Sequence, residues 1–270
     1  MYSSEERIAS TILKRQVRSL VEAGQRLDGR AFNEMREVRV KPGKFTRGEG
    51  EAWVSLGGTQ VLAGVKVDVG APFPDTPDKG VLITNVELLP MASPTFEPGP
   101  PDENAIEMAR VVDRALRGSN AIAFEELVIK EGEHVYLIFL DMYVLDHDGN
   151  LIDALALASV TALKNAMIPE VTIGPDGGLS PTGEYRPLPM RDLPITFSFA
   201  KIGRALLLDP CLEEELVADA LITLSIDRDG RVCSIQKREG SLTAEEIINA
   251  IRVARSKWPD LARMIEEGGA

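Results

Sequence analysis

The sequence predicts an α+β protein made of two units of strands and helices behind an N-terminal amphipathic helix. The spacing of apolar residues switches along the chain between about 3.6, typical of helices, and two, typical of strands. Five prolines and four glycines lie within residues 174–194, a composition that indicates a linker. The two halves share an outline of strands followed by a helix, which is compatible with an internal duplication. We therefore place the N-terminal helix at residues 1–25, the first unit at 26–170, the linker at 171–190 and the second unit at 191–270.

A helix is predicted directly at the N-terminal end of the sequence. Ser3 and Glu6 have the spacing of a capping box, and apolar residues then recur at helical spacing until Gly24. The pattern leaves two interpretations open, packing of this helix on its own domain and docking on a partner subunit.

Alternating apolar and polar residues predict the strands of both units, with glycine-rich or aspartate-rich turns between them. In the first unit the predicted strands are residues 38–40, 52–56, 61–67, 81–89 and 136–145. In the second unit they are residues 195–199, 205–208, 221–226 and 232–236.

Three further helices are predicted from helical spacing and from capping residues. They run from a cap at Asp102 to Gly118, over residues 152–167, and from a cap at Ser241 or Thr243 toward Met264. The second of these is strongly apolar, so we expect it to be buried.

The charge balance limits what the protein can bind through bulk electrostatics. Thirty Lys and Arg against 42 Asp and Glu give a formal net charge of −12. This excludes a broadly basic protein that coats nucleic acid or anionic membranes, but it leaves room for a local basic patch. No apolar run approaches the ~18 residues of a transmembrane helix, and the polar, acidic start does not resemble a signal peptide. We expect a cytoplasmic protein without a membrane partner.

Three arginines on the predicted helix 102–118 are the strongest candidates for a binding site. Arg110 and Arg114 are four residues apart and share one helix face, with Arg117 beside Arg114. Guanidinium groups bind phosphates through two hydrogen bonds and keep their charge at any relevant pH. Two of them on adjacent turns could therefore contact successive phosphates of a single strand. The competing interpretation is a solvated face in which Asp113 is the local ion partner.

The other candidate motifs have simpler structural interpretations. Residues 57–59, Gly-Gly-Thr, lack the lysine of a phosphate-binding loop and fit a hairpin turn. Residues 146–150 place a histidine between two aspartates but fit a turn better than a catalytic site. Asp209 and the glutamate run 213–215 could bind a divalent metal, although three consecutive glutamates are more often solvated. No local motif by itself predicts an enzyme.

Four segments, in this order, resemble the RNase PH family, whose members degrade RNA by phosphorolysis. They are residues 26–30 with 48–63, residues 107–117, residues 144–154 and residues 187–210. The resemblance extends over about residues 5–260 and is closest to the non-catalytic RNase-PH-like subunits of archaeal exosomes. It implies an RNase PH-like fold of two duplicated units.

Departures from the pattern of the catalytic members imply, within this resemblance, that the chain belongs to the non-catalytic branch. Catalytic members carry Gly-Thr/Ser-Arg before the apolar helix, whereas residues 149–151 are Gly, Asn and Leu, without the phosphate-binding Arg. Of the two aspartates that catalytic members place in the second unit, Asp209 matches one, and a glutamate, Glu215, falls near the other. The loop 91–101 also lacks the basic residues of the catalytic members.

The resemblance implies a non-catalytic subunit that structures the active site of a catalytic RNase-PH-like partner for 3′–5′ RNA degradation. The implied assembly is a hexameric ring of three heterodimers, topped by RNA-binding cap subunits. Arg110, Arg114 and Arg117 are then expected to bind single-stranded RNA, and no catalytic residue, metal ligand or cofactor is expected in this chain. Two alternatives stay open: a phosphorolytic 3′–5′ exoribonuclease active on its own, and a scaffold of this fold with no role in RNA binding.

Overall fold

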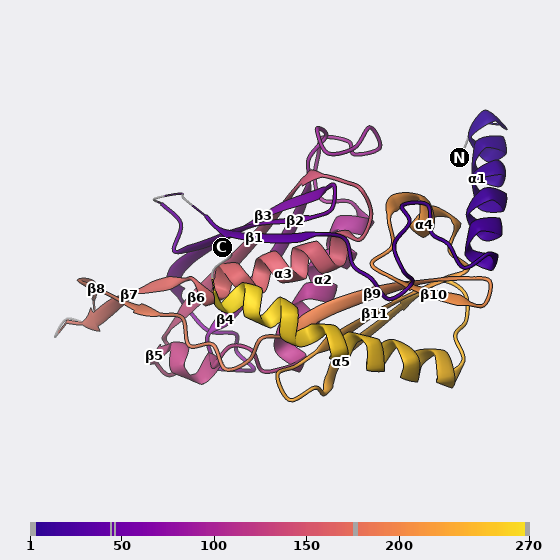
Figure 1. Ribbon diagram of the computed structural model, residues 1–270. Helices are drawn as coiled ribbons and strands as arrows, with labels where there is room; N and C mark the ends of the chain where they lie inside the picture. The colour runs from indigo at the N-terminus through magenta and orange to yellow at the C-terminus, as the bar shows by residue number, and fades with distance from the viewer. Residues whose placement is uncertain (1–3, 44, 46, 175–177, 268–270) are drawn as a thin grey trace.

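The computed structural model describes residues 4–43, 45, 47–174 and 178–267, which form two main β-sheets and a separate two-stranded sheet, with helices between and beside the main sheets (Figure 1). This arrangement confirms the predicted α+β class. The larger sheet has six strands in the order β1-β2-β3-β6-β4, with β5 paired to β6. Its strands are β1 (Val38–Pro42), β2 (Gly50–Leu56), β3 (Thr59–Gly70), β4 (Val81–Leu88), β5 (Val128–Lys130) and β6 (His134–Asp146).

The smaller sheet has four antiparallel strands in the order β10-β9-β11-β12. Its strands are β9 (Ile195–Ile202), β10 (Ala205–Leu208), β11 (Ala220–Ile226) and β12 (Val232–Arg238). Nearly every residue of β9 is buried, on both faces of the sheet. Other elements must therefore cover this sheet on both sides.

Helices provide that cover. The helices of the described chain are α1 (Ser4–Glu22), α2 (Glu103–Gly118), α3 (Leu151–Lys164), α4 (Leu212–Val217), α5 (Ala244–Glu266) and the 3₁₀ helix η1 (Phe124–Leu127). On β9, Ser198 donates a hydrogen bond to Asp153 of α3, whereas Lys201 forms an ion pair with Glu246 of α5. Residues three apart in a strand point to opposite faces, so α3 and α5 cover opposite faces of the smaller sheet.

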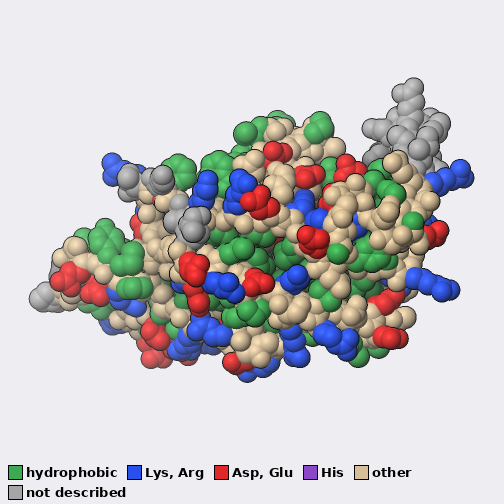
Figure 2. Space-filling model, in the orientation of Figure 1, with side chains coloured by type: hydrophobic (Ala, Val, Ile, Leu, Met, Phe, Trp, Pro, Cys, Tyr) green, Lys and Arg blue, Asp and Glu red, His purple; other side chains and the backbone are tan. Residues whose placement is uncertain are grey.

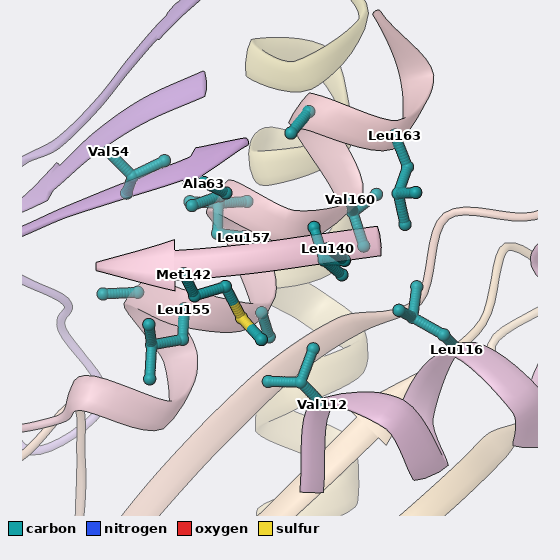
Figure 3. Close-up of a cluster of buried hydrophobic side chains, with 14 of the residues drawn as sticks. Val54, Ala63, Val112, Leu116, Leu140, Met142, Leu155, Leu157, Val160 and Leu163 are labelled. Carbon is teal, nitrogen blue, oxygen red and sulfur yellow. The ribbon is translucent and has the colours of Figure 1, made fainter. Parts of the chain in front are cut away.

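The main hydrophobic core fills the space between the larger sheet, α2 and α3 (Figure 3). Residues 151–163 of α3 are all buried, as expected of a helix that is apolar all round. The labelled core residues are Val54, Ala63, Val112, Leu116, Leu140, Met142, Leu155, Leu157, Val160 and Leu163. This packing fixes the rotation of α2, whose buried face points at the core and whose polar face points outward.

The C-terminal half of α1 packs on the second half of the chain. Val17 and Val21 form a small apolar cluster with Ile202 of β9, Leu207 of β10 and Val217 of α4. The capping box predicted at Ser3 lies outside the described residues. The contacts of Val17 and Val21 favour packing on the protein's own fold for this half of the helix.

The segment predicted as a linker, residues 171–190, is largely a β-hairpin. β7 (Met167–Ile173) and β8 (Leu179–Pro187) pair antiparallel and project away from the two sheets in Figure 1. Composition misses this hairpin because β8 is mostly exposed, so no apolar alternation marks it, and because exposed ribbon strands tolerate proline. The helix predicted over 152–167 ends earlier, at Lys164. The chain then enters β7, to which Met167 already belongs. The limits of the two units stay a prediction.

The other predicted strands and helices are confirmed to within a few residues. Asp102 caps α2, and Thr243 and Glu246 form the predicted capping box of α5. Within the described part of the chain, no helix has both the length and the apolar character needed to cross a bilayer.

Candidate functional site

The helix α2 presents the three predicted arginines at the surface. Asp102 begins the helix by accepting a hydrogen bond from the backbone N–H of Ala105 (2.8 Å). The opposite face is buried in the core, so Arg110, Arg114 and Arg117 are all exposed. The structure brings the three residues together on one helix but leaves their guanidiniums in different surroundings.

Arg117 is engaged within the chain. Its Nε lies 2.9 Å from both carboxylate oxygens of Asp113, and its Nη2 donates to the carbonyl of Leu82 at 3.0 Å. Its guanidinium also lies 5.5 Å from the centre of the Phe124 ring, a cation–π geometry. Because these partners already satisfy its charge, Arg117 is the weakest of the three candidates.

Arg110 and Arg114 keep their charge available. Among the described residues, Arg110 forms no side-chain hydrogen bond or ion pair. Arg114 donates one hydrogen bond from Nη2 to Oε1 of Gln236 (2.9 Å), which is a neutral partner. The two residues are about one helical turn apart, about 6 Å along the helix axis, and neither guanidinium is neutralised by a carboxylate of the described chain.

A second group of charged residues gathers around Asp209, whose side chain is fully buried. Arg36 donates to its carboxylate from the backbone N (2.8 Å), Nε (3.0 Å) and Nη2 (2.7 Å), and Arg30 donates from Nη1 (3.0 Å). Burial alone would raise the pKa of Asp209, but Arg36 and then Asn150 bring it below its ordinary value. This carboxylate is therefore ionised and already neutralised by cations of the same chain.

Asn150 occupies the position where the resemblance places phosphate-binding groups. Its Nδ2 donates to Asp209 (2.7 Å) and to Asp153 (2.8 Å). Its Oδ1 is buried and has no hydrogen-bond partner among the described residues. The next residue, Leu151, is buried in the core. An acceptor oxygen next to two carboxyl groups offers no donor to a phosphate, so this segment is a poor anion site.

The glutamate run 213–215 is not a solvated stretch, contrary to the prediction, because it lies in α4. Glu213 is exposed, but Glu214 is fully buried and pairs with the equally buried Arg26. The two contacts are Nε to Oε1 at 2.9 Å and Nη2 to Oε2 at 2.6 Å. The run alternates between solvent and interior because α4 turns each residue by about 100° relative to the last.

Glu215 faces the turn before α3. It accepts a hydrogen bond from the backbone N–H of Asn150 (3.0 Å), and burial raises its pKa to about 7. Asp209 and the glutamate run 213–215 are the carboxylates that the sequence offers for a metal ion. In the part of the chain that the structure describes, no group of three or more His, Cys, Asp or Glu side chains is arranged to hold one.

A cavity of about 440 Å³ opens beside Asn150, between α2, α4 and β12. Its ionisable lining residues are Glu107, His147, Glu215, Arg238 and Glu239. His147 stacks on Phe96, with the ring centres 5.4 Å apart, and burial lowers the pKa of this histidine. Three carboxyl groups against one guanidinium make this cavity unfavourable for inorganic phosphate.

Two carboxyl groups beside Asp209, the buried Asp153 and the half-buried Glu215, titrate near neutrality. Burial raises the pKa of Asp153 to about 7, although hydrogen bonds from Asn150 and Ser198 oppose the shift, and burial acts on Glu215 in the same direction. A carboxyl group with a raised pKa binds more protons in the folded than in the unfolded state. Its contribution to stability is therefore complete at low pH and is lost as the pH rises from about 4 to about 7.

Asp153→Asn removes one of these groups and keeps its hydrogen bonds, because the hydroxyl of Ser198 can donate to Thr223 (2.9 Å) instead. As the pH rises from about 5 to about 7, the wild type should lose stability that the variant keeps. We therefore expect the free energy of unfolding of the variant, relative to that of the wild type, to increase by up to about 1.4 kcal/mol per pH unit. Urea unfolding at several pH values measures this difference. Asp75→Asn, on an exposed loop, is the control, and parallel profiles for Asp153→Asn and the wild type would contradict the assignment.

The sequence did not reveal the roles of Arg26, Arg30 and Arg36. Their acceptors lie more than 170 residues away in the chain, so no local spacing connects them. The one available signal is the presence of three arginines within residues 26–36 and an acidic stretch at 209–215. Such groups must pair if the fold buries them.

The described geometry defines an RNase PH-like α+β protein. It has an exposed arginine helix, α2, and a filled site around Asp209, whose carboxylate is already bound by Arg36, Arg30 and Asn150. The model for 3′ exoribonuclease family, domain 1, matches residues 34–169, and the model for domain 2 of the same family matches residues 192–257. This chain belongs to the 3′ exoribonuclease family, which confirms the resemblance found in the sequence.

The relatives are similar over almost their whole length. The exosome complex component Rrp42 of Thermococcus gammatolerans is 48% identical over 266 residues, 98% of this chain and 97% of the relative. The Rrp42 of Methanothermobacter thermautotrophicus is 42% identical over 96% of both chains. A chain of the Archaeoglobus fulgidus exosome with RNA bound to the active site matches with a TM-score of 0.86 and 44% identity, covering 95% of this chain and 98% of that chain. A chain of an archaeal exosome core matches with a TM-score of 0.81 and 40% identity, covering 96% and 99%.

Proposed function

We propose that this chain is a component of an exosome, corresponding to Rrp42, and that it takes part in 3′–5′ RNA degradation in the cytoplasm. The observation that carries the proposal is the similarity to proteins of that name over 98% of this chain. The fold shared with chains of archaeal exosome structures, at 40% identity or more, supports it.

Within that complex the chain is non-catalytic. The filled site around Asp209 supports this part of the proposal. Arg36, Arg30 and Asn150 occupy the carboxylate of Asp209, so it is not free to act on a substrate. Leu151 stands where a guanidinium would bind phosphate, and the neighbouring cavity is acidic.

The chain acts through its surface instead. Its partner is a catalytic RNase-PH-like subunit, with which it forms a hexameric ring of three heterodimers beneath RNA-binding cap subunits. It structures the active site of that partner and holds the backbone of single-stranded RNA through Arg110 and Arg114. Arg117 contributes less because Asp113 neutralises it. Figure 2 shows Lys and Arg interspersed with Asp and Glu over one face of the molecule, which fits contact through a few residues rather than through bulk charge.

Charge reversal tests the RNA-binding role. We expect Arg110→Glu with Arg114→Glu to weaken binding of a labelled oligoadenylate to the reconstituted complex by about tenfold or more, and to lower the slope of log affinity against log salt by about 1.4, or 0.7 for each lost phosphate contact. Fluorescence anisotropy over a salt series measures both quantities. Arg252→Glu with Arg263→Glu, two exposed positions of α5, makes the same change in net charge and is the control.

The assembly and the activity of the variants decide between the alternatives. Ring assembly, followed by mass measurement, should be intact in both double variants, and the chain without its partner should release no nucleoside diphosphates from RNA, phosphate and magnesium. If the Arg110/Arg114 variant bound RNA as well as the wild type, the chain would instead be a scaffold of this fold with no role in RNA binding. Turnover by the isolated chain would make it an exoribonuclease in its own right.

A further inference from the structure

We propose that Gln236 of β12 is a positioning residue that holds Arg114 in place and leaves the charges of Arg110 and Arg114 unpaired with a carboxylate, and thus available to RNA. This inference rests on the proposed function. It comes from a short chain of hydrogen bonds that links α2 of the first half of the chain to β12 of the second.

The amide of Gln236 is oriented from both of its ends. Its Nε2 donates to Oε1 of Glu107 at 3.2 Å, and its Oε1 accepts from Nη2 of Arg114 at 2.9 Å. A carboxylate oxygen accepts and cannot donate, so the contact with Glu107 decides which end of the amide faces Arg114. The guanidinium is thereby restrained from a separate strand of the protein.

The neutrality of this partner matters for the charge of the helix face. Asp113 holds Arg117 through both carboxylate oxygens and neutralises it. Gln236 restrains Arg114 through one hydrogen bond and brings no negative charge. Arg114 therefore meets a phosphate with its full positive charge and with less side-chain freedom to lose on binding.

The same amide diverts Glu107 from Arg110. These two residues are three apart on α2, a spacing that allows an ion pair. Instead, Glu107 accepts from Gln236 on one oxygen, and its other oxygen lies 3.8 Å from Nε of Arg238. Among the described residues no ion pair joins Glu107 to Arg110. Two residues of β12 thus engage Glu107, while Asp113, three residues on the other side of Arg110, is engaged by Arg117.

The distance between α2 and β12 is fixed by close packing. A Cβ at Gly118, at the end of α2, would overlap the backbone oxygen of Cys233. The helix and the strand can approach this closely only because residue 118 is a glycine. Gln236 follows Cys233 by three residues on the same strand, so its amide is delivered to α2 by rigid elements rather than by a loop.

Substitutions of Gln236 in the reconstituted complex test the inference, with a labelled oligoadenylate as the probe. Gln236→Glu should weaken binding by about fivefold and lower the salt slope by about 0.7, because it neutralises one phosphate-binding guanidinium. Gln236→Leu, which removes the restraint but adds no charge, should weaken binding by about twofold at an unchanged salt slope. Gln25→Glu adds the same charge on the exposed segment after α1 and should have no effect.

A variant without the two guanidiniums separates positioning from a general structural role. At a salt concentration low enough for Arg110→Ala with Arg114→Ala still to bind, Gln236→Glu should cause no further loss in that background. An equal loss in both backgrounds would overturn the positioning role of Gln236 and leave the proposed function standing. Wild-type affinity of the Arg110/Arg114 double alanine variant would instead overturn the proposed RNA-binding role itself.

Discussion

Replacing Arg26 with methionine should lower the free energy of unfolding by about 3–5 kcal/mol, because it leaves the charge of Glu214 buried without its cation. Both side chains are fully buried, at 0% exposure. The guanidinium also donates to the backbone carbonyls of Leu208 (2.9 Å) and Asp209 (2.9 Å), which the methionine would leave without these donors. Urea unfolding of the purified chain measures the loss.

A second substitution identifies the source of that loss. Arg26→Met with Glu214→Leu removes both charges and should recover a large part of the stability, because the desolvated carboxylate is gone. Arg39→Met breaks an exposed ion pair with Glu37 and should leave the stability almost unchanged. If the double variant were no more stable than Arg26→Met, the uncompensated charge of Glu214 would not be the cause.

Gly149→Ala, which adds one methyl group to the turn before α3, should lower the free energy of unfolding by more than about 4 kcal/mol or prevent folding. Gly149 has a φ of 83°, in the left-handed region that favours glycine. A Cβ there would also overlap the backbone of Cys211 and Leu212 at the start of α4. Relief of this overlap must move the turn away from α4, and the turn carries Asn150 and its hydrogen bond to Asp209.

The control separates the two effects. Gly132 has a similar φ of 72°, but a Cβ there would have no neighbour within 4 Å. Gly132→Ala should therefore cost only the backbone term, about 1–2 kcal/mol. Thermal unfolding of both variants measures the difference, and equal losses at the two positions would show that the contact with α4 is not tight.

Much of the fold was predictable from the sequence because its signals are local. The 3.6 period and the Asp102 cap define α2, and the same period decides that Arg110 and Arg114 face outward when Val112 and Leu116 face the core. The Gly-Gly turn between β2 and β3 and the capping box of Thr243 are equally short-range, since each depends on residues within a few positions. The family resemblance then supplied the expected function.

Tertiary structure alone decided which charged groups are free. Arg26 pairs with Glu214 across 188 residues, and Arg36 pairs with Asp209 across 173, so nothing in the local sequence distinguishes these buried residues from solvated ones. The partner of Arg114, Gln236, likewise comes from 122 residues away. The sequence by itself determined most of the helices and strands and the presence of the arginine helix, because hydrogen bonds and side-chain periodicity act over one or two turns. The filled site around Asp209 and the hydrogen bond that restrains Arg114 depended on the packing of the two halves, because burial and ion pairing join residues that only folding brings together.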